Sequence, residues 1–142
     1  MNEKRIESAY WALRIAYGVV PIVAGLDKFT NLLVDWKTYL SPVAIRLLPV
    51  SPTTFMHLVG VIEIVVGLLV LFAATRVGAY IAAVWLACIA LNILTSGQHL
   101  DVAVRDAVMA IGAYTLARLQ EVRVVASARS SARSVEPAHA PA

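Results

Sequence analysis

The chain has 142 residues, of which 60% are hydrophobic and 15% charged, and its mean hydropathy is +0.76. Soluble domains contain roughly 45–50% apolar residues, so this composition favours an integral membrane protein of one domain over a soluble helical bundle. Many of the basic residues behind the net charge of +3 lie near the chain ends. We therefore expect contact with lipid and not with nucleic acid.

The first predicted membrane-spanning helix covers residues 7–28. A basic start and an apolar middle are also typical of a signal peptide, but Arg14 interrupts the apolar part, so we expect a retained helix. Residues at alternating intervals of four and three share one helix face, and that face carries Arg14, Gly18, Pro21, Gly25 and Lys28. Small residues on it allow a second helix to pack closely.

A long connector, residues 27–53, separates the first two spans. It contains two Ser-Pro pairs, at 41–42 and 51–52, and each matches an N-cap followed by proline at the first helical position. The first pair predicts a short helix that ends near Leu48. The second pair predicts the start of the next span.

Three further membrane-spanning helices are predicted at residues 53–74, 77–95 and 101–119. The fourth span has the weakest support, because its charged residues leave a short uncharged core. From residue 121 the chain turns polar, and its end is rich in Ala, Ser, Pro and Arg, so 121–142 is predicted to be a disordered cytoplasmic tail. The predicted fold is an all-α, integral membrane four-helix bundle over residues 1–120.

The basic residues also predict the orientation of the chain. With four spans, Lys28, Lys37 and Arg46 lie on one side, and Arg76 and the basic residues near both chain ends lie on the other. The positive-inside rule then places both termini in the cytoplasm and the long connector outside. The expected location is a bacterial-type inner, or plasma, membrane.

Glu63 lies near the middle of the second span, where a charge costs several kcal/mol unless it is paired or protonated. Arg14 lies at a similar depth in the first span, given a helical rise of about 1.5 Å per residue. We therefore predict an intramembrane Arg14–Glu63 pair. Such a pair either fixes the packing of the helices or forms a proton or ligand site, and the sequence leaves both interpretations open.

A second polar group is predicted nearer the outer face, with Asp27, His99 and Asp101 among its members. Its candidate pocket residues are Lys28, His57, Asn92, Arg105 and Asp106. We interpret it either as an ion network at the helix ends or as a ligand pocket, with Lys28–Asp106 as one pairing. His57 and His99 lie on separate elements without a histidine or cysteine cluster, so no metal site is predicted. No motif identifies a catalytic residue.

Several segments resemble the DoxX-like family of small four-helix membrane proteins: RIAYG at 14–18, GLDKF at 25–29, GVIEIVVGLLV at 60–70 and RVGAY at 76–80. The resemblance covers about residues 10–120. It implies that the family's typical polar positions are Arg14, Lys28, Glu63, Arg105 and Asp106. The family is named from a subunit of thiosulfate:quinone oxidoreductase, and related members are linked to redox complexes.

The resemblance implies an accessory or quinone-interacting subunit of a membrane redox complex. Its partners would be the lipid bilayer and a redox protein, and its ligand a quinone that is not covalently bound. A chain this small without a cofactor motif is not expected to be an enzyme on its own. Two alternatives stay open: a small-solute or proton-coupled carrier acting as a homo-oligomer, and a structural assembly protein.

Overall fold

The structure, a computed structural model, describes residues 3–135 of the chain. This part is all-α, as predicted, and its main helices are α1 (Glu3–Thr30), α3 (Pro52–Leu68), α4 (Thr75–Ser96) and α5 (Leu100–Val135). Three short elements complete it: the 3₁₀ helix η1 (Trp36–Tyr39), α2 (Pro42–Leu47) and the π-helical turn η2 (Leu69–Ala73), which extends α3.

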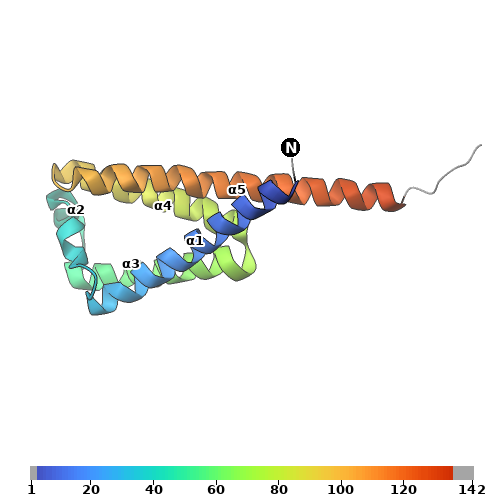
Figure 1. The fold of residues 1–142 in the computed structure, drawn as a ribbon. Coiled ribbons are helices and arrows are strands. Elements are labelled where there is room, and N and C mark those ends of the chain that lie inside the picture. The colour runs from blue at the N-terminus through green and yellow to red at the C-terminus, as the bar shows by residue number, and fades with distance from the viewer. Residues whose placement is uncertain (1–2, 136–142) are drawn as a thin grey trace, which may run out of the picture.

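Three of these helical segments are long and apolar enough to cross a membrane: Lys4–Thr30, Pro52–Ala73 and Thr75–Ser96. They coincide with the first three predicted spans. Helix α5 is not among them, because Asp101, Arg105 and Asp106 interrupt its apolar part. Its role as a fourth span stays a prediction, although it runs beside α4 along the length of that helix (Figure 1).

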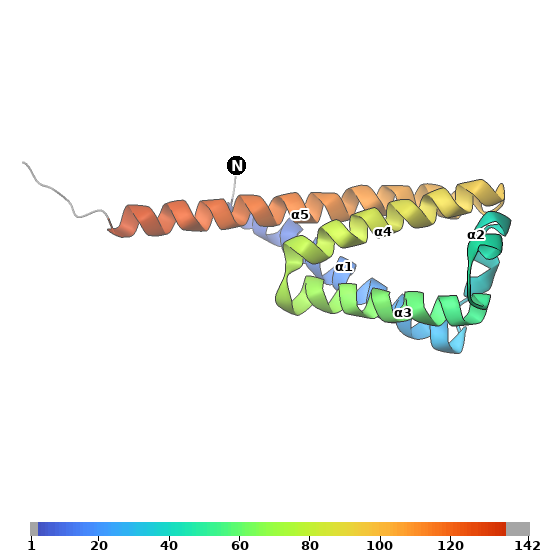
Figure 2. The ribbon, with the colours of Figure 1, turned by 180° about the vertical axis from the view of Figure 1, so that it is seen from behind.

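The helices form two pairs, α1 with α3 and α4 with α5 (Figures 1 and 2). The pairs converge at one end, where η2 leads into α4, and spread apart towards the other end. There the connector with η1 and α2 crosses from one pair to the other (Figure 2). The result is a wedge with a narrow end and a wide end.

Close glycine contacts hold α1 against α3. A Cβ atom on Gly25 would lie 2.5 Å from the carbonyl oxygen of Gly60, and one on Gly67 would lie 2.5 Å from that of Gly18. Since no side chain fits into such a space, the two backbones can approach only because these positions are glycine. The predicted small-residue face of the first helix is confirmed.

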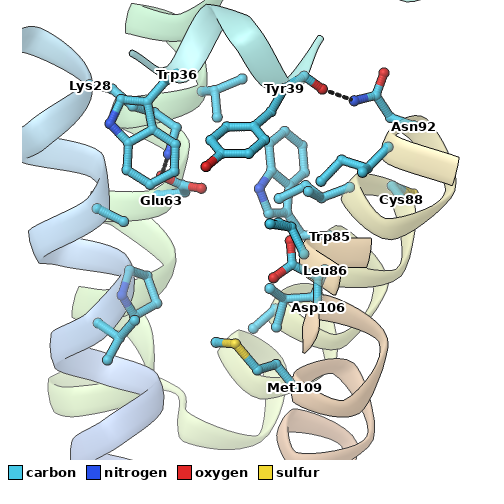
Figure 3. Close-up of a pocket in the computed structure, with 18 of the residues that line it drawn as sticks. Lys28, Trp36, Tyr39, Glu63, Trp85, Leu86, Cys88, Asn92, Asp106 and Met109 are labelled. Carbon is cyan, nitrogen blue, oxygen red and sulfur yellow. Dashed lines mark hydrogen bonds and ion pairs between the residues drawn. The ribbon is translucent and has the colours of Figure 1, made fainter. Parts of the chain in front are cut away.

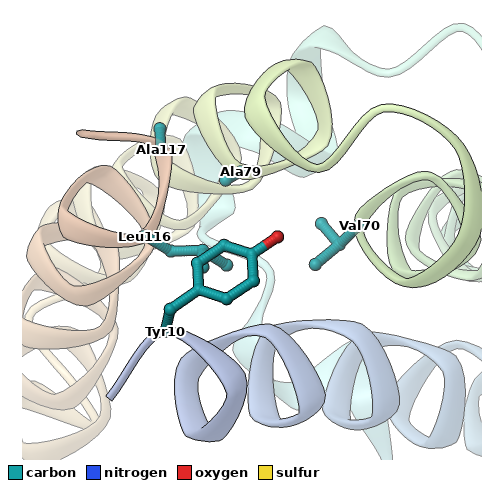
Figure 4. Close-up of a cluster of buried hydrophobic side chains, with 5 residues drawn as sticks. All are labelled: Tyr10, Val70, Ala79, Leu116 and Ala117. Atoms are coloured by element: carbon teal, nitrogen blue, oxygen red, sulfur yellow. The ribbon is translucent and has the colours of Figure 1, made fainter. Parts of the chain in front are cut away.

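Buried side chains from α1, η2, α4 and α5 close the narrow end. The ring of Tyr10 is fully buried there and packs with Val70, Ala79, Leu116 and Ala117 (Figure 4). Ion pairs surround this cluster: Arg123 contacts Glu7 at 2.7 Å, and Arg76 contacts Glu121 at 2.9 Å. The two helix pairs are therefore joined firmly at this end.

Both Ser-Pro signals are confirmed. The side-chain oxygen of Ser41 accepts a hydrogen bond from the backbone N–H of Ala44, and that of Ser51 accepts one from Thr54, each at 3.1 Å. These N-caps start α2 and α3, with proline in the first turn.

The predicted disordered tail is wrong for residues 121–135, which continue α5 beyond the other helices (Figure 1). Residues 113–136 contain neither glycine nor proline, and alanine and arginine are good helix formers. A composition typical of disorder is therefore also compatible with a long helix. The predicted tail beyond residue 135 lies outside the described residues.

Candidate functional site in the wedge

A cavity of about 700 Å³ lies between the two helix pairs. Its walls are mainly apolar, with Val59 and Val66 of α3 facing Ala82, Leu86 and Ile89 of α4. The hydrogen bond from the Tyr17 hydroxyl to the carbonyl oxygen of Met109, at 2.6 Å, joins α1 to α5 towards the narrow end. Trp36 and Tyr39 of the connector line the cavity at its wide end.

One wall of the cavity carries a buried ion pair. The Nζ atom of Lys28 lies 2.6 Å from the Oε2 atom of Glu63, and both residues are less than a tenth exposed. The ring of Trp36 covers this pair, with its centroid 3.6 Å from the same Nζ atom (Figure 3). The ammonium group is thus held by a carboxylate and by the face of an indole ring.

The predicted Arg14–Glu63 pair is wrong, because Lys28 is the partner of Glu63. Arg14 instead donates hydrogen bonds from Nε to the carbonyl oxygen of Val70, at 3.1 Å, and from Nη2 to that of Leu71, at 2.6 Å. Carbonyl groups at a helix end lack partners within the helix, and a cation there also interacts favourably with the helix dipole. Arg14 therefore caps carbonyl groups of η2, the turn that extends α3, and does not line the cavity.

The opposite wall carries a second carboxylate. Asp106 of α5 is 5% exposed and accepts a hydrogen bond from Nε of Arg105 at 3.0 Å. The predicted Lys28–Asp106 pair is not formed, since each residue has another partner. Asp106 nevertheless lies within electrostatic range of Glu63 across the cavity, and both carboxylates face the same space (Figure 3).

Trp85 of α4 stands beside these groups. Its Nε1 atom is buried and has no hydrogen-bond partner among the described residues. The N–H is directed towards the Glu63 carboxylate but forms no hydrogen bond with it in this structure (Figure 3). A buried donor in this state costs roughly 1–3 kcal/mol, so the position favours an additional acceptor.

The connector is tied to both helix pairs. Asp27 of α1 accepts hydrogen bonds from the backbone N–H of Leu32, at 2.9 Å, and from Nε1 of Trp36, at 2.8 Å. On the other side, Asn92 of α4 donates to the carbonyl oxygen of Tyr39 at 2.8 Å and accepts from the N–H of Ser41 at 3.2 Å. These bonds hold the two aromatic rings over the wide end.

A family model described as DoxX matches residues 9–95. The chain belongs to the DoxX family. No curated protein and no solved structure matches it significantly. With three helices long and apolar enough to cross a membrane, this DoxX protein is a multi-pass membrane protein.

The match to DoxX includes three of the polar residues in the cavity, Lys28, Glu63 and Asn92, and also Trp85. Arg105 and Asp106 of α5 follow the matched segment. Of the residues predicted for a ligand pocket, Lys28, Asn92, Arg105 and Asp106 all line the cavity. Four of the five predicted pocket residues are therefore brought together around one space, together with Glu63.

His57 does not line the cavity. Its ring stacks on that of Phe29, with centroids 4.9 Å apart, near the end of α1 and the start of α3. His99 packs against Tyr39. Among the described residues, no group of three or more histidine, cysteine or acidic side chains could hold a metal ion.

The sequence prediction did not include the aromatic residues of the site, Trp36, Tyr39 and Trp85. A signal for Trp85 exists in the sequence. It lies seven residues before Asn92, and residues seven apart share a helix face. A polar residue on that face indicates that Trp85 points in the same direction.

Proposed function

We propose that this DoxX protein is an accessory membrane subunit of a redox assembly, and that its cavity binds the ring of a quinone. The main observation behind this proposal is that the apolar walls of the cavity surround a small polar centre. Ligand sites are commonly mostly apolar with a few convergent polar groups that fix orientation. A quinone has the matching form, with polar oxygens on a ring and an apolar chain.

Access from the bilayer supports this proposal. Val19, Val20 and Val23 of α1 line the cavity, and each is about half exposed, so other described parts of the chain do not cover them. In a membrane these side chains face lipid. A lipid-soluble molecule can therefore reach the cavity from the hydrocarbon core without crossing the aqueous phase.

The volume of the cavity supports the same class of ligand. Small-molecule pockets typically measure about 300–1,000 Å³, and the cavity has about 700 Å³. This space accommodates a substituted ring and part of its chain. In this proposal the residues that line the cavity bind and orient the ring, and a partner protein carries out the redox chemistry.

The proposed orientation places both termini in the cytoplasm and the connector outside, in a bacterial-type inner membrane. A test uses Cys88→Ser as background and introduces cysteine at Lys37 or Arg133. A membrane-impermeant maleimide should label the first in intact cells and the second only after lysis. Labelling of the second in intact cells would contradict this orientation.

The experiment that tests the function is purification of the tagged protein in a mild detergent. The eluate is analysed by mass spectrometry for protein partners and by solvent extraction for quinone. The control is internal: quinone per protein is compared with quinone per phospholipid in the same eluate and in whole membranes. Lipid carried over nonspecifically leaves the quinone-to-phospholipid ratio unchanged.

We expect quinone enriched over phospholipid and a stoichiometric oxidoreductase partner. A homo-oligomer with quinone only at the membrane ratio would contradict the proposal. Proton-coupled uptake of a small solute into liposomes that contain the protein, lost in the Glu63→Gln variant, would then identify the protein as a carrier.

A further inference from the structure

The polar centre of the cavity consists of Lys28, Glu63, Trp85 and Asp106. The donors and acceptors in it that lack partners determine which ligand group can bind there. The ammonium group of Lys28 is buried, donates a hydrogen bond to Glu63 and lies against the face of the Trp36 ring. Trp85 presents a buried N–H donor without a partner among the described residues. Within the described part of the chain, the donor of this centre that has no partner is thus the Trp85 N–H, and the acceptors with spare lone pairs are the oxygen atoms of two carboxylates.

Asp106 has acceptor capacity to spare. An ionised carboxylate has about four lone-pair positions, yet the described residues supply Asp106 with one bond, from Arg105 to Oδ1. Its side chain projects towards the same space as Glu63 and Trp85 (Figure 3). A ligand group placed between them meets a donor on one side and acceptors on the other.

This combination selects among the polar groups that an apolar ligand can carry. A carbonyl oxygen only accepts hydrogen bonds, so it could pair with Trp85 but would face the two carboxylates unfavourably. An ammonium group only donates, so it would leave the Trp85 N–H unpaired. A hydroxyl group accepts one bond and donates another, and thereby satisfies both sides.

We infer that the polar centre binds a ring hydroxyl, so that the cavity prefers the reduced quinol form of its ligand to the quinone. In the inferred complex the hydroxyl oxygen accepts from Nε1 of Trp85, and the hydroxyl proton is donated to Asp106 or Glu63. This inference rests on the proposed function and adds which redox form is held. A subunit with this preference retains quinol next to the partner protein.

The test measures equilibrium binding of two matched probe pairs to the full chain in lipid nanodiscs. The first pair is decylubiquinol and decylubiquinone. The second pair is 4-nonylphenol and its methyl ether, in which a methyl group replaces the hydroxyl hydrogen, and neither compound depends on redox state. We expect the quinol and the phenol each to bind at least tenfold more tightly than the partner compound.

Asp106→Asn should reduce the quinol preference to less than threefold, because the Asn amide can donate to a carbonyl oxygen. Asp101→Asn is the matched control, since Asp101 is exposed on the same helix and does not line the cavity, and it should keep the preference. If Asp106→Asn does not fold, the inference is tested by comparing the affinities of the unchanged protein for the phenol and for its ether.

Equal affinities within each probe pair, or tighter binding of the quinone and the ether, would overturn the inference while leaving the proposed function in place. Absence of saturable binding for all four compounds would overturn both.

Discussion

Lys28 and Glu63 form the ion pair on which the polar centre depends. When one partner of a buried pair is removed, the other stays buried as an uncompensated charge, which typically costs about 3–5 kcal/mol. Lys28→Met should therefore lower the stability by about that amount in thermal or denaturant unfolding of the detergent-solubilised protein. The double variant Lys28→Met/Glu63→Leu should recover most of the loss, and a double variant as unstable as Lys28→Met alone would contradict this account.

Arg14 makes a separate contribution to stability. Since it caps carbonyl groups at the end of α3 and does not contact Glu63, the effects of Arg14→Gln and Glu63→Gln should be additive within about 0.5 kcal/mol. The measurement is a double-mutant cycle on the free energy of unfolding. A coupling energy above about 1 kcal/mol between these two positions would contradict this account and support the Arg14–Glu63 pair predicted from the sequence.

The reason for that wrong pairing lies in helix register. Gly25 faces Gly60 and Gly18 faces Gly67, so α1 and α3 run antiparallel in a register that brings Arg14 opposite Leu71. Glu63 lies eight residues, or about 12 Å, further along the helix. Helical side chains also point towards the N-terminus of their own helix. In antiparallel helices this brings Lys28 and Glu63 towards each other.

This register was available from the sequence. Two glycines seven residues apart in each helix, 18 with 25 and 60 with 67, match each other only in one antiparallel alignment. The Arg14–Glu63 pair was instead predicted from the depth of each residue along its helix. That depth depends on helix ends that the sequence places only approximately.

At the scale of elements, the α1–α3 pair depends on its glycine contacts. Gly25→Ala would place a Cβ atom 2.5 Å from a backbone oxygen, and that atom can move only if the helices separate. We expect a loss of about 1–3 kcal/mol in unfolding free energy. Ala16→Leu, on an exposed part of the same helix, is the control and should change stability little. Equal losses in both variants would contradict close packing at Gly25.

The element boundaries could be predicted where local chemistry sets them. Apolar length predicted the first three spans, and the Ser-Pro pairs predicted the starts of α2 and α3. The extension of α5 could not be predicted in this way, because no apolar periodicity or cap marks residues 121–135. Contacts from distant parts of the chain, such as Glu7 with Arg123, hold the start of this extension in place.

At the scale of the whole molecule, the narrow end holds the two helix pairs together. Arg123 contributes to this with two hydrogen bonds to Glu7, at 2.7 and 3.0 Å, and a position 3.8 Å from the centroid of the Tyr10 ring. Because the ion pair is partly exposed, Arg123→Gln should cost only about 1–2 kcal/mol. Arg129→Gln, on the exposed part of α5, should leave the unfolding midpoint unchanged. A larger effect of Arg129→Gln than of Arg123→Gln would contradict this.

The wedge itself was not predictable from single helices. The polar residues of the cavity were identified in the sequence, but their arrangement on two facing walls depends on how the helix pairs diverge. That divergence follows from the tightly packed narrow end and from the connector that spans the wide end, both of which join residues far apart in the chain.

The central claim, that the cavity is the ligand site, is tested most directly by titrating decylubiquinone into three forms of the purified protein. They are the unchanged chain, Val59→Trp and Val61→Trp. Val59 is buried and lines the cavity, whereas Val61 is half exposed on the outer side of the same helix. We predict saturable binding to the unchanged chain and to Val61→Trp, and its loss in a folded Val59→Trp. Equal binding to all three forms would show that the ligand binds elsewhere and would contradict the account.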